Sequence, residues 1–99
     1  MANRTILWSK TAVKQFETAI KYIIADSIVN AEKVSADILK QIVKAAKNPE
    51  GFPPDKYKQN NNGSYRAFEK HRYRIVYRFT DNSVQILRVR HTAKEPKKY

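Results

Sequence analysis

Residues 65–91 read YRAFEKHRYRIVYRFTDNSVQILRVRH, and this stretch decides the fold. It holds three short runs rich in β-branched, aromatic and arginine residues, at 65–70, 72–79 and 84–91. Such runs, with apolar and polar positions alternating, are typical of strands that have one buried face. Residues 80–83 (TDNS) are turn-forming residues between the last two runs. The stretch therefore predicts three strands of a mainly antiparallel sheet.

The alternation also predicts which face of the sheet is buried. In the run at 72–79 the core positions are Tyr73, Ile75, Tyr77 and Phe79. In the run at 84–91, Leu87 and Val89 are better core residues than Arg88 and Arg90, which should point outward. We expect an open face opposite the core, and the arginines on or near it are Arg66, Arg74, Arg78, Arg88 and Arg90.

An exposed sheet that carries arginines can follow a phosphate backbone. The alternative is an ordinary solvated face, because antiparallel sheets commonly expose polar residues on one side. The whole chain has 20 Lys and Arg against 9 Asp and Glu, for a net charge of +11. This surplus favours binding to a polyanion, either a nucleic acid or an acidic protein.

The N-terminal half predicts one short strand and two helices. A β-like run at 4–8 (RTILW) is followed by Ser9, which can cap a helix. Apolar residues then recur every three or four positions over 10–25 and again over 28–47, the spacing of helices with one buried face. Pro49 ends the second helix, since the residue before a proline disfavours the α conformation. Two helices so closely connected form an antiparallel hairpin.

Residues 48–64 (NPEGFPPDKYKQNNNGS) predict a loop, with three prolines and both glycines of the chain. A loop of this length is uncommon and often functional, although a plain connector is the alternative. Residues 1–99 suit a single domain. The predicted fold class is α+β, with the helix hairpin packed on one face of a small, mainly antiparallel sheet.

Composition excludes several kinds of site. The absence of cysteine excludes disulfides and thiolate chemistry, and two histidines offer no metal-ligand cluster. We therefore expect no metal and no cofactor. No apolar run approaches the ~18–20 residues of a membrane span, so we expect a cytoplasmic protein without membrane contact.

His91 is a candidate general acid or base at the end of the last predicted strand. The alternative is a structural histidine that forms a hydrogen bond with the C-terminal tail. His71 lies in a predicted turn, and we expect it to be solvated.

Six short motifs follow one another along the chain. They are W-S-x-x-A at 8–12, Y-I at 22–23, N-P at 48–49, Y-R-x-F at 65–68, Y-R-I-V-Y at 73–77 and I-L-R-V-R-H at 86–91. In this order they resemble the RelE/ParE superfamily of bacterial toxins from type II toxin–antitoxin modules, over nearly the whole chain. The resemblance implies an antitoxin partner that wraps the toxin, which we expect to be acidic and to form a hetero-oligomer with it.

The resemblance implies two alternative activities. RelE-like members cut mRNA in the ribosomal A site without a metal, and ParE-like members poison DNA gyrase. We favour ribosome-dependent mRNA cleavage, with the ribosome and mRNA as partners, and keep gyrase inhibition as the alternative. The residues to which we assign catalysis are Arg66, Arg74, His91 and Tyr99, and those to which we assign nucleic-acid contacts are Arg78, Arg88, Arg90 and Lys94. The chain departs from the ribonuclease pattern at Phe68, where a second basic residue is expected, and at Ala93 or Lys94, where an arginine is expected.

Overall fold

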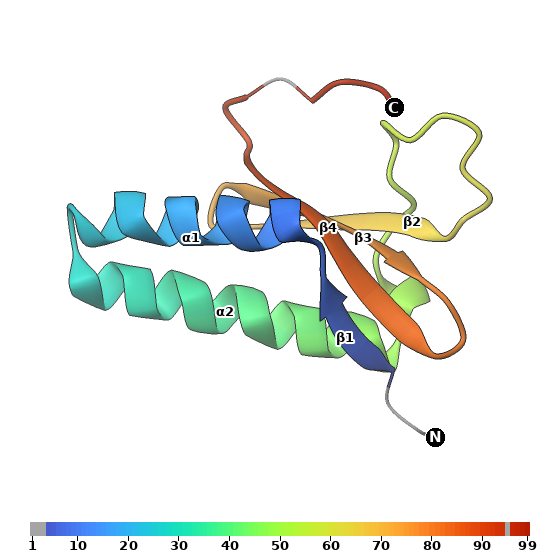
Figure 1. Ribbon diagram of the computed structural model, residues 1–99, viewed down its shortest axis with the longest axis horizontal. Helices are drawn as coiled ribbons and strands as arrows, with labels where there is room; N and C mark the ends of the chain where they lie inside the picture. The colour runs from blue at the N-terminus through green and yellow to red at the C-terminus, as the bar shows by residue number, and fades with distance from the viewer. Residues whose placement is uncertain (1–3, 95) are drawn as a thin grey trace.

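A four-stranded sheet packs against a helical hairpin in the computed structural model, which describes residues 4–94 and 96–99 (Figure 1). In chain order the elements are β1 (Thr5–Trp8), α1 (Lys10–Ile24), α2 (Ile28–Lys47), the 3₁₀ turn η1 (Pro49–Gly51), β2 (Tyr65–Lys70), β3 (Tyr73–Phe79) and β4 (Ser83–His91). The strand order is β1-β4-β3-β2, with β1 parallel to β4 and the other pairs antiparallel. The predicted α+β fold is confirmed.

Both helices begin at a serine N-cap. Ser9 Oγ accepts a hydrogen bond from the N–H of Ala12 at 3.0 Å, and Ser27 Oγ accepts one from the N–H of Asn30 at 3.1 Å. Caps of this kind stabilise a helix by about 1 kcal/mol each. The Ser9 hydroxyl also donates to the carbonyl of Leu87 at 3.1 Å, which ties the start of α1 to β4. Within the described residues, neither helix is long and apolar enough to cross a membrane.

The core lies between the hairpin and one face of the sheet. Its largest fully buried side chains are Ile38, Ile42, Ile75, Tyr77, Val84 and Ile86. The hydroxyl of Tyr77 donates to the carbonyl of Pro49 at 2.6 Å, which satisfies the one polar group of this buried side chain. The bond joins the centre of the sheet to η1, directly after α2, and so fixes the point at which the following loop begins.

β3 and β4 pair irregularly at one point. Val76 lies opposite Arg88, but the next residue, Tyr77, lies opposite Ile86, which leaves Leu87 as an extra residue in a β-bulge. The bulge shifts the alternation of β4 by one residue, so Ile86 is buried in the core while Leu87 is only partly buried. The expectation that Leu87 is a core residue is wrong, because the alternation of a single strand does not reveal a bulge.

The face of the sheet opposite the hairpin is covered. Residues 52–64 turn around the outer edge of β2, where Pro54 forms a β-bridge with Arg66. They then cross to the face opposite the hairpin, and residues 96–99 lie beside them (Figure 1). We call these two segments the loop cover. Beneath it Val76 is only 6% exposed although it points away from the helices, so the expectation of an open arginine face is wrong.

Candidate functional site

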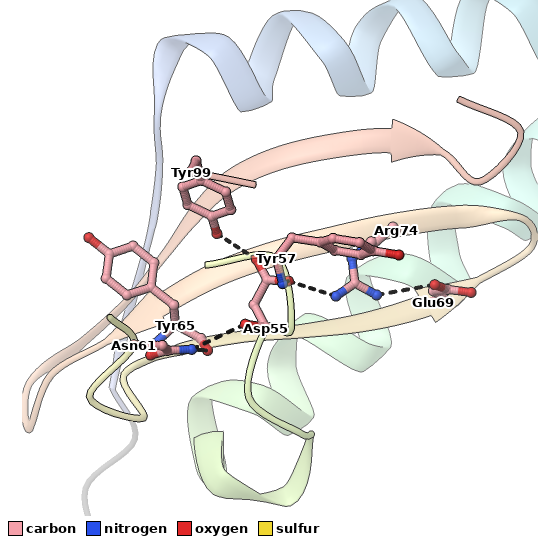
Figure 2. A network of polar contacts seen from close by, with 7 residues as sticks. All are labelled: Asp55, Tyr57, Asn61, Tyr65, Glu69, Arg74 and Tyr99. Carbon is pink, nitrogen blue, oxygen red and sulfur yellow. Dashed lines mark hydrogen bonds and ion pairs between the residues drawn. The ribbon is translucent and has the colours of Figure 1, made fainter. Parts of the chain in front are cut away.

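Asp55 is the centre of a polar network beneath the loop cover (Figure 2). Its exposure is 2%, and it is the one buried charged residue in the described part of the chain. Arg74 Nη2 donates to its Oδ1 at 2.8 Å, the Tyr99 hydroxyl donates to its Oδ2 at 2.5 Å, and the N–H of Tyr57 donates to Oδ1 at 3.2 Å. A carboxylate removed from water needs such donors. The loop, β3 and the C-terminal tail therefore meet at one side chain.

The network separates the pKa values of its two acidic groups. Burial raises the pKa of Asp55, but the hydrogen bonds from Tyr99, Arg74 and the Tyr57 N–H, together with the charge of Arg74, outweigh burial and bring this pKa below its ordinary value of 3.8. For Tyr99, burial and then the hydrogen bond to Asp55 raise the pKa above its ordinary value of 10.0. At neutral pH Asp55 is therefore ionised and Tyr99 is protonated, so Tyr99 can donate a proton but cannot act as a base.

The charge of Arg74 is compensated within the chain. Its Nη1 donates to Glu69 at 3.1 Å, and its guanidinium lies 5.0 Å from the centre of the Tyr57 ring (Figure 2). The side chain is 12% exposed, and its Nε is buried without a hydrogen-bond partner among the described residues. A guanidinium already bonded to two carboxylates has little capacity left for a phosphate. Arg74 can take its predicted catalytic role only if Asp55 moves away.

Asn61 fixes the shape of the loop around Asp55. Its Nδ2 donates to the carbonyl of Tyr65 at 2.8 Å, and its Oδ1 accepts from the N–H groups of Gly63 at 2.9 Å and Tyr65 at 3.2 Å. Gly63 has a φ of +97°, a conformation that residues with a Cβ rarely adopt. The loop is therefore a specifically bonded structure and not a plain connector.

The cations predicted to bind nucleic acid on β3 and β4 share this face with Arg74. The Arg88 guanidinium lies 4.5 Å from the centre of the Tyr99 ring, Arg90 lies opposite Arg74, and Arg78 is exposed. A cleft lined by Arg74, Arg88, Arg90 and the tail measures about 20 Å³, which is room for about one water molecule. A phosphate group does not fit there while the loop cover is closed.

Arg66 lies on the opposite face of the sheet from Arg74. It pairs with Tyr77, whose side chain is in the core. Its Nε donates to the carbonyl of Gly63 at 2.7 Å, and its Nη1 donates to the carbonyl of Phe52 at 3.0 Å. The predicted convergence of Arg66 with Arg74 is therefore wrong. Arg66 instead holds the two ends of the loop together.

His91 also lies on the hairpin side of the sheet. It pairs with Tyr73, and the two rings meet edge to face with their centres 5.2 Å apart. Its Nδ1 accepts a hydrogen bond from the N–H of Ala93 at 3.0 Å, which is the bond to the tail expected of a structural histidine. Lys94 follows and is exposed. The sheet separates His91 from Arg74, so the predicted convergence of these two residues is also wrong.

His71 is not the free turn residue that the sequence predicts. Its Nε2 lies 2.6 Å from Oδ2 of Asp37 on α2. The hydrogen bond to His71 is the largest of the effects that shift the pKa of Asp37, and this pKa lies below its ordinary value. His71 and Arg72 both have positive φ, 51° and 68°, as a two-residue hairpin turn requires. The contact joins this turn to the hairpin.

Two of the residues that sequence reasoning named, Arg74 and Tyr99, meet in this network, but sequence reasoning missed Asp55, Tyr57 and Asn61. A single aspartate in a loop between a proline and a lysine resembles any solvated acid, and the unusual length of the loop was the one available signal. Within the described residues, no group of three His, Cys, Asp or Glu side chains could hold a metal ion. The site is therefore an ion-paired and covered arginine surface.

Comparison with known proteins places the chain in a family. A family model described as the ParE toxin of the type II toxin–antitoxin system parDE matches residues 6–96. The chromosomal ParDE toxin–antitoxin system from P. aeruginosa has a similar structure, with a TM-score of 0.66, 16% identity, and coverage of 89% of this chain and 95% of that chain. The YoeB dimer from Staphylococcus aureus has a TM-score of 0.58, 23% identity, and coverage of 88% and 94%.

At these identities the likeness to the two solved structures concerns the fold alone, and no functionally curated protein matches the chain. The family model, by contrast, spans nearly all of the sequence and agrees with the motifs of the RelE/ParE superfamily. The chain therefore belongs to the ParE toxin family of type II toxin–antitoxin systems, whose members act together with a cognate antitoxin.

Proposed function

We propose that this toxin inhibits DNA gyrase by binding to it and does not cut RNA. This reverses the preference drawn from the sequence, which placed mRNA cleavage first. The family is one support, because ParE-like members of the superfamily poison gyrase. The second support is the geometry of the residues that a ribonuclease mechanism would need.

The main support for the proposal is that the predicted catalytic residues lie on opposite faces of the sheet. Cleavage through the 2′-hydroxyl needs a base, an acid and cations at the phosphate within one site. Arg66 and His91 lie on the hairpin side of the sheet, whereas Arg74 and Tyr99 lie on the other side. Arg74 is further neutralised by Asp55 and Glu69. Inhibition by binding needs no such constellation.

Pulse labelling after induced expression tests the proposal. DNA synthesis should stop before protein synthesis, and the purified toxin should inhibit supercoiling by gyrase in vitro. Primer extension on mRNA from the same cells should show no new cleavage sites. If protein synthesis stops first and new mRNA ends appear, the toxin is a ribonuclease and the proposal is wrong.

One observation favours mRNA cleavage as the second candidate. Arg74, Arg88, Arg90 and Tyr99 line a single cleft, which would become a phosphate site if the loop cover opened. Arg74→Ala should then reduce cleavage by about 10²–10³-fold, as expected for loss of a group that stabilises the transition state. The matched control is Arg78→Ala, on the same strand face but exposed. If both variants lost cleavage activity to the same extent, Arg74 would have no special role in cleavage.

A further inference from the structure

A row of alternating cations and aromatic rings crosses the face of the sheet on which the loop cover lies. Its members come from β4, the tail, the loop, β2 and β3, and in this order they are Arg88, Tyr99, Lys58, Tyr65 and Arg78. The Arg88 guanidinium lies 4.5 Å and Lys58 Nζ lies 5.3 Å from the centre of the Tyr99 ring. Lys58 Nζ lies 4.9 Å and the Arg78 guanidinium lies 5.5 Å from the centre of the Tyr65 ring. We call these five residues the cation–aromatic row.

The two rings hold the three cations in fixed places. The rings of Tyr65 and Tyr99 meet edge to face with their centres 6.2 Å apart (Figure 2). Tyr65 lies directly opposite Arg78 in the pairing of β2 with β3, and Tyr99 is anchored to the loop by its main chain. Because a cation is attracted to the face of an aromatic ring, these long side chains lose mobility when the protein folds. The row is therefore organised before any ligand binds, which lowers the entropic cost of binding.

The positive charge of the row is not compensated within the chain. In the part of the chain that the structure describes, no ion pair includes a cation of the row. Asp55 and Glu69 lie on the same side of the sheet, but both of these carboxylates pair with Arg74. Arg78 is exposed, and the other two cations of the row are partly exposed. An anionic ligand in solvent can therefore reach three charges that no internal carboxylate neutralises.

We infer that the cation–aromatic row binds the phosphate backbone of double-stranded DNA. A row of fixed and unpaired cations suits a polymer whose negative charges are regularly spaced. Each ring of the row already contacts two cations, so little of its surface is free to stack on an unpaired base. The row therefore suits a duplex, whose bases stack on one another, better than a single strand. Contacts to phosphates alone carry no sequence preference.

The biological role of this DNA site rests on the proposed function. A toxin that binds gyrase lies next to the DNA on which gyrase acts, and the row would hold that DNA. The experiment therefore measures binding to DNA and inhibition of gyrase separately, so that each idea can fail without the other.

Binding to DNA is measured with the full-length toxin in the absence of gyrase. The probe is a fluorescein-labelled duplex of twenty base pairs and mixed sequence, and fluorescence anisotropy gives the Kd at several salt concentrations. If each cation of the row contacts one phosphate, the row contributes about 2.7 to the steepness with which log K falls against log [salt], because each contact contributes about 0.9.

Single charge removals locate the contact. Lys58→Gln and Arg78→Gln each remove a cation of the row, whereas Lys40→Gln on α2 and Arg72→Gln in the β2–β3 turn remove the same charge elsewhere. Each row variant should lower the steepness by about 0.9 and weaken binding about eightfold at ~0.1 M salt, which is that change in steepness written as an affinity. Each control should weaken binding less than about twofold, because salt at ~0.1 M screens charges outside the contact.

Three results would overturn the inference. They are absence of binding by the wild type, equal weakening by row and control variants, and tighter row-dependent binding of a twenty-nucleotide oligouridine than of the duplex. The second result would mean that net charge alone attracts DNA, and the third that the row takes a single strand.

A supercoiling assay on the same proteins separates the inference from the proposed function. If the wild type inhibits gyrase but the row variants bind DNA as tightly as the controls, only the inference is wrong. If the wild type binds the duplex through the row but leaves gyrase active, the proposed function is wrong and the DNA site stands.

Discussion

A buried carboxylate is stabilised by the groups that donate to it, and Asp55 receives donors from three separate segments. Asp55→Asn keeps the shape of the side chain but removes its charge. We expect the free energy of unfolding to fall by about 2–4 kcal/mol, because Arg74 remains buried with one partner fewer. Urea unfolding measures the change.

The matched control at this scale is Glu69→Gln. The side chain of Glu69 is 55% exposed, so its ion pair with Arg74 is screened by water. Loss of this ion pair should lower the free energy of unfolding by at most about 1 kcal/mol. If Asp55→Asn and Glu69→Gln lowered the free energy of unfolding by similar amounts, burial of Asp55 would not determine the strength of its ion pair with Arg74.

The pH dependence of stability should also depend on Asp55. Because the pKa of Asp55 in the folded state lies below its ordinary value of 3.8, the unfolded chain takes up the proton first as the pH falls. The stabilisation from Asp55 is therefore complete above about pH 5 and is lost as the pH falls through 3.8 and below. Urea unfolding at several pH values should show that the free energies of unfolding of the wild type and of Asp55→Asn converge as the pH falls. If the two free energies of unfolding differed by the same amount at every pH from 7 to 3, the pH dependence assigned to Asp55 would be wrong.

At the scale of elements, the loop and the tail form one unit. The N–H of Gln59 donates to the main-chain oxygen of Tyr99 at 2.6 Å, and the N–H of Tyr99 donates to the carbonyl of Tyr57 at 3.0 Å. Deleting residues 96–99 should therefore remove the protection of the Gln59 amide against hydrogen exchange. The amide of Ile75 in β3 should keep its protection, since the sheet retains its own bonds.

Tyr99→Phe separates the two roles of the tail. It keeps the main-chain bonds to residues 57 and 59 but removes the hydroxyl that donates to Asp55. We expect protection at Gln59 to persist in this variant while stability falls by about 1–2 kcal/mol. Loss of protection in Tyr99→Phe equal to that in the deletion would show that the hydroxyl, and not the main chain, holds the tail.

The regular elements were predictable because their patterns are local. Helical spacing and serine caps gave both helices, and alternation gave the three C-terminal strands, each within one or two residues of its observed bounds. The hydrogen-bond and ion-pair partners of the arginines could not be predicted from such local patterns. Phe68, two residues after Arg66 on the same strand face, is buried, and this alternation places Arg66 on the core side and not on the predicted open face. Asp55 reaches Arg74 across 19 residues, which no periodic pattern encodes.

At the scale of the whole molecule, the net charge of +11 should govern encounter with the antitoxin. We expect this partner to be acidic, so association should slow as salt screens the attraction. Stopped-flow mixing with the antitoxin should show at least a tenfold lower association rate as ionic strength rises from ~0.01 M to ~1 M, where the Debye length shrinks from ~30 Å to ~3 Å. An association rate indifferent to salt would show that charge does not guide the encounter.

The parallel pairing of β1 with β4 joins the first described strand to the last. During synthesis, β1 and the helical hairpin emerge first, and their apolar sides have no sheet to pack against until the final strand follows. Pairs so distant in sequence form late, because closing a long loop is entropically costly. The four-stranded sheet is therefore complete only after β4 has been synthesised. Until then, the nascent chain is an incomplete domain whose exposed apolar surface is prone to aggregation.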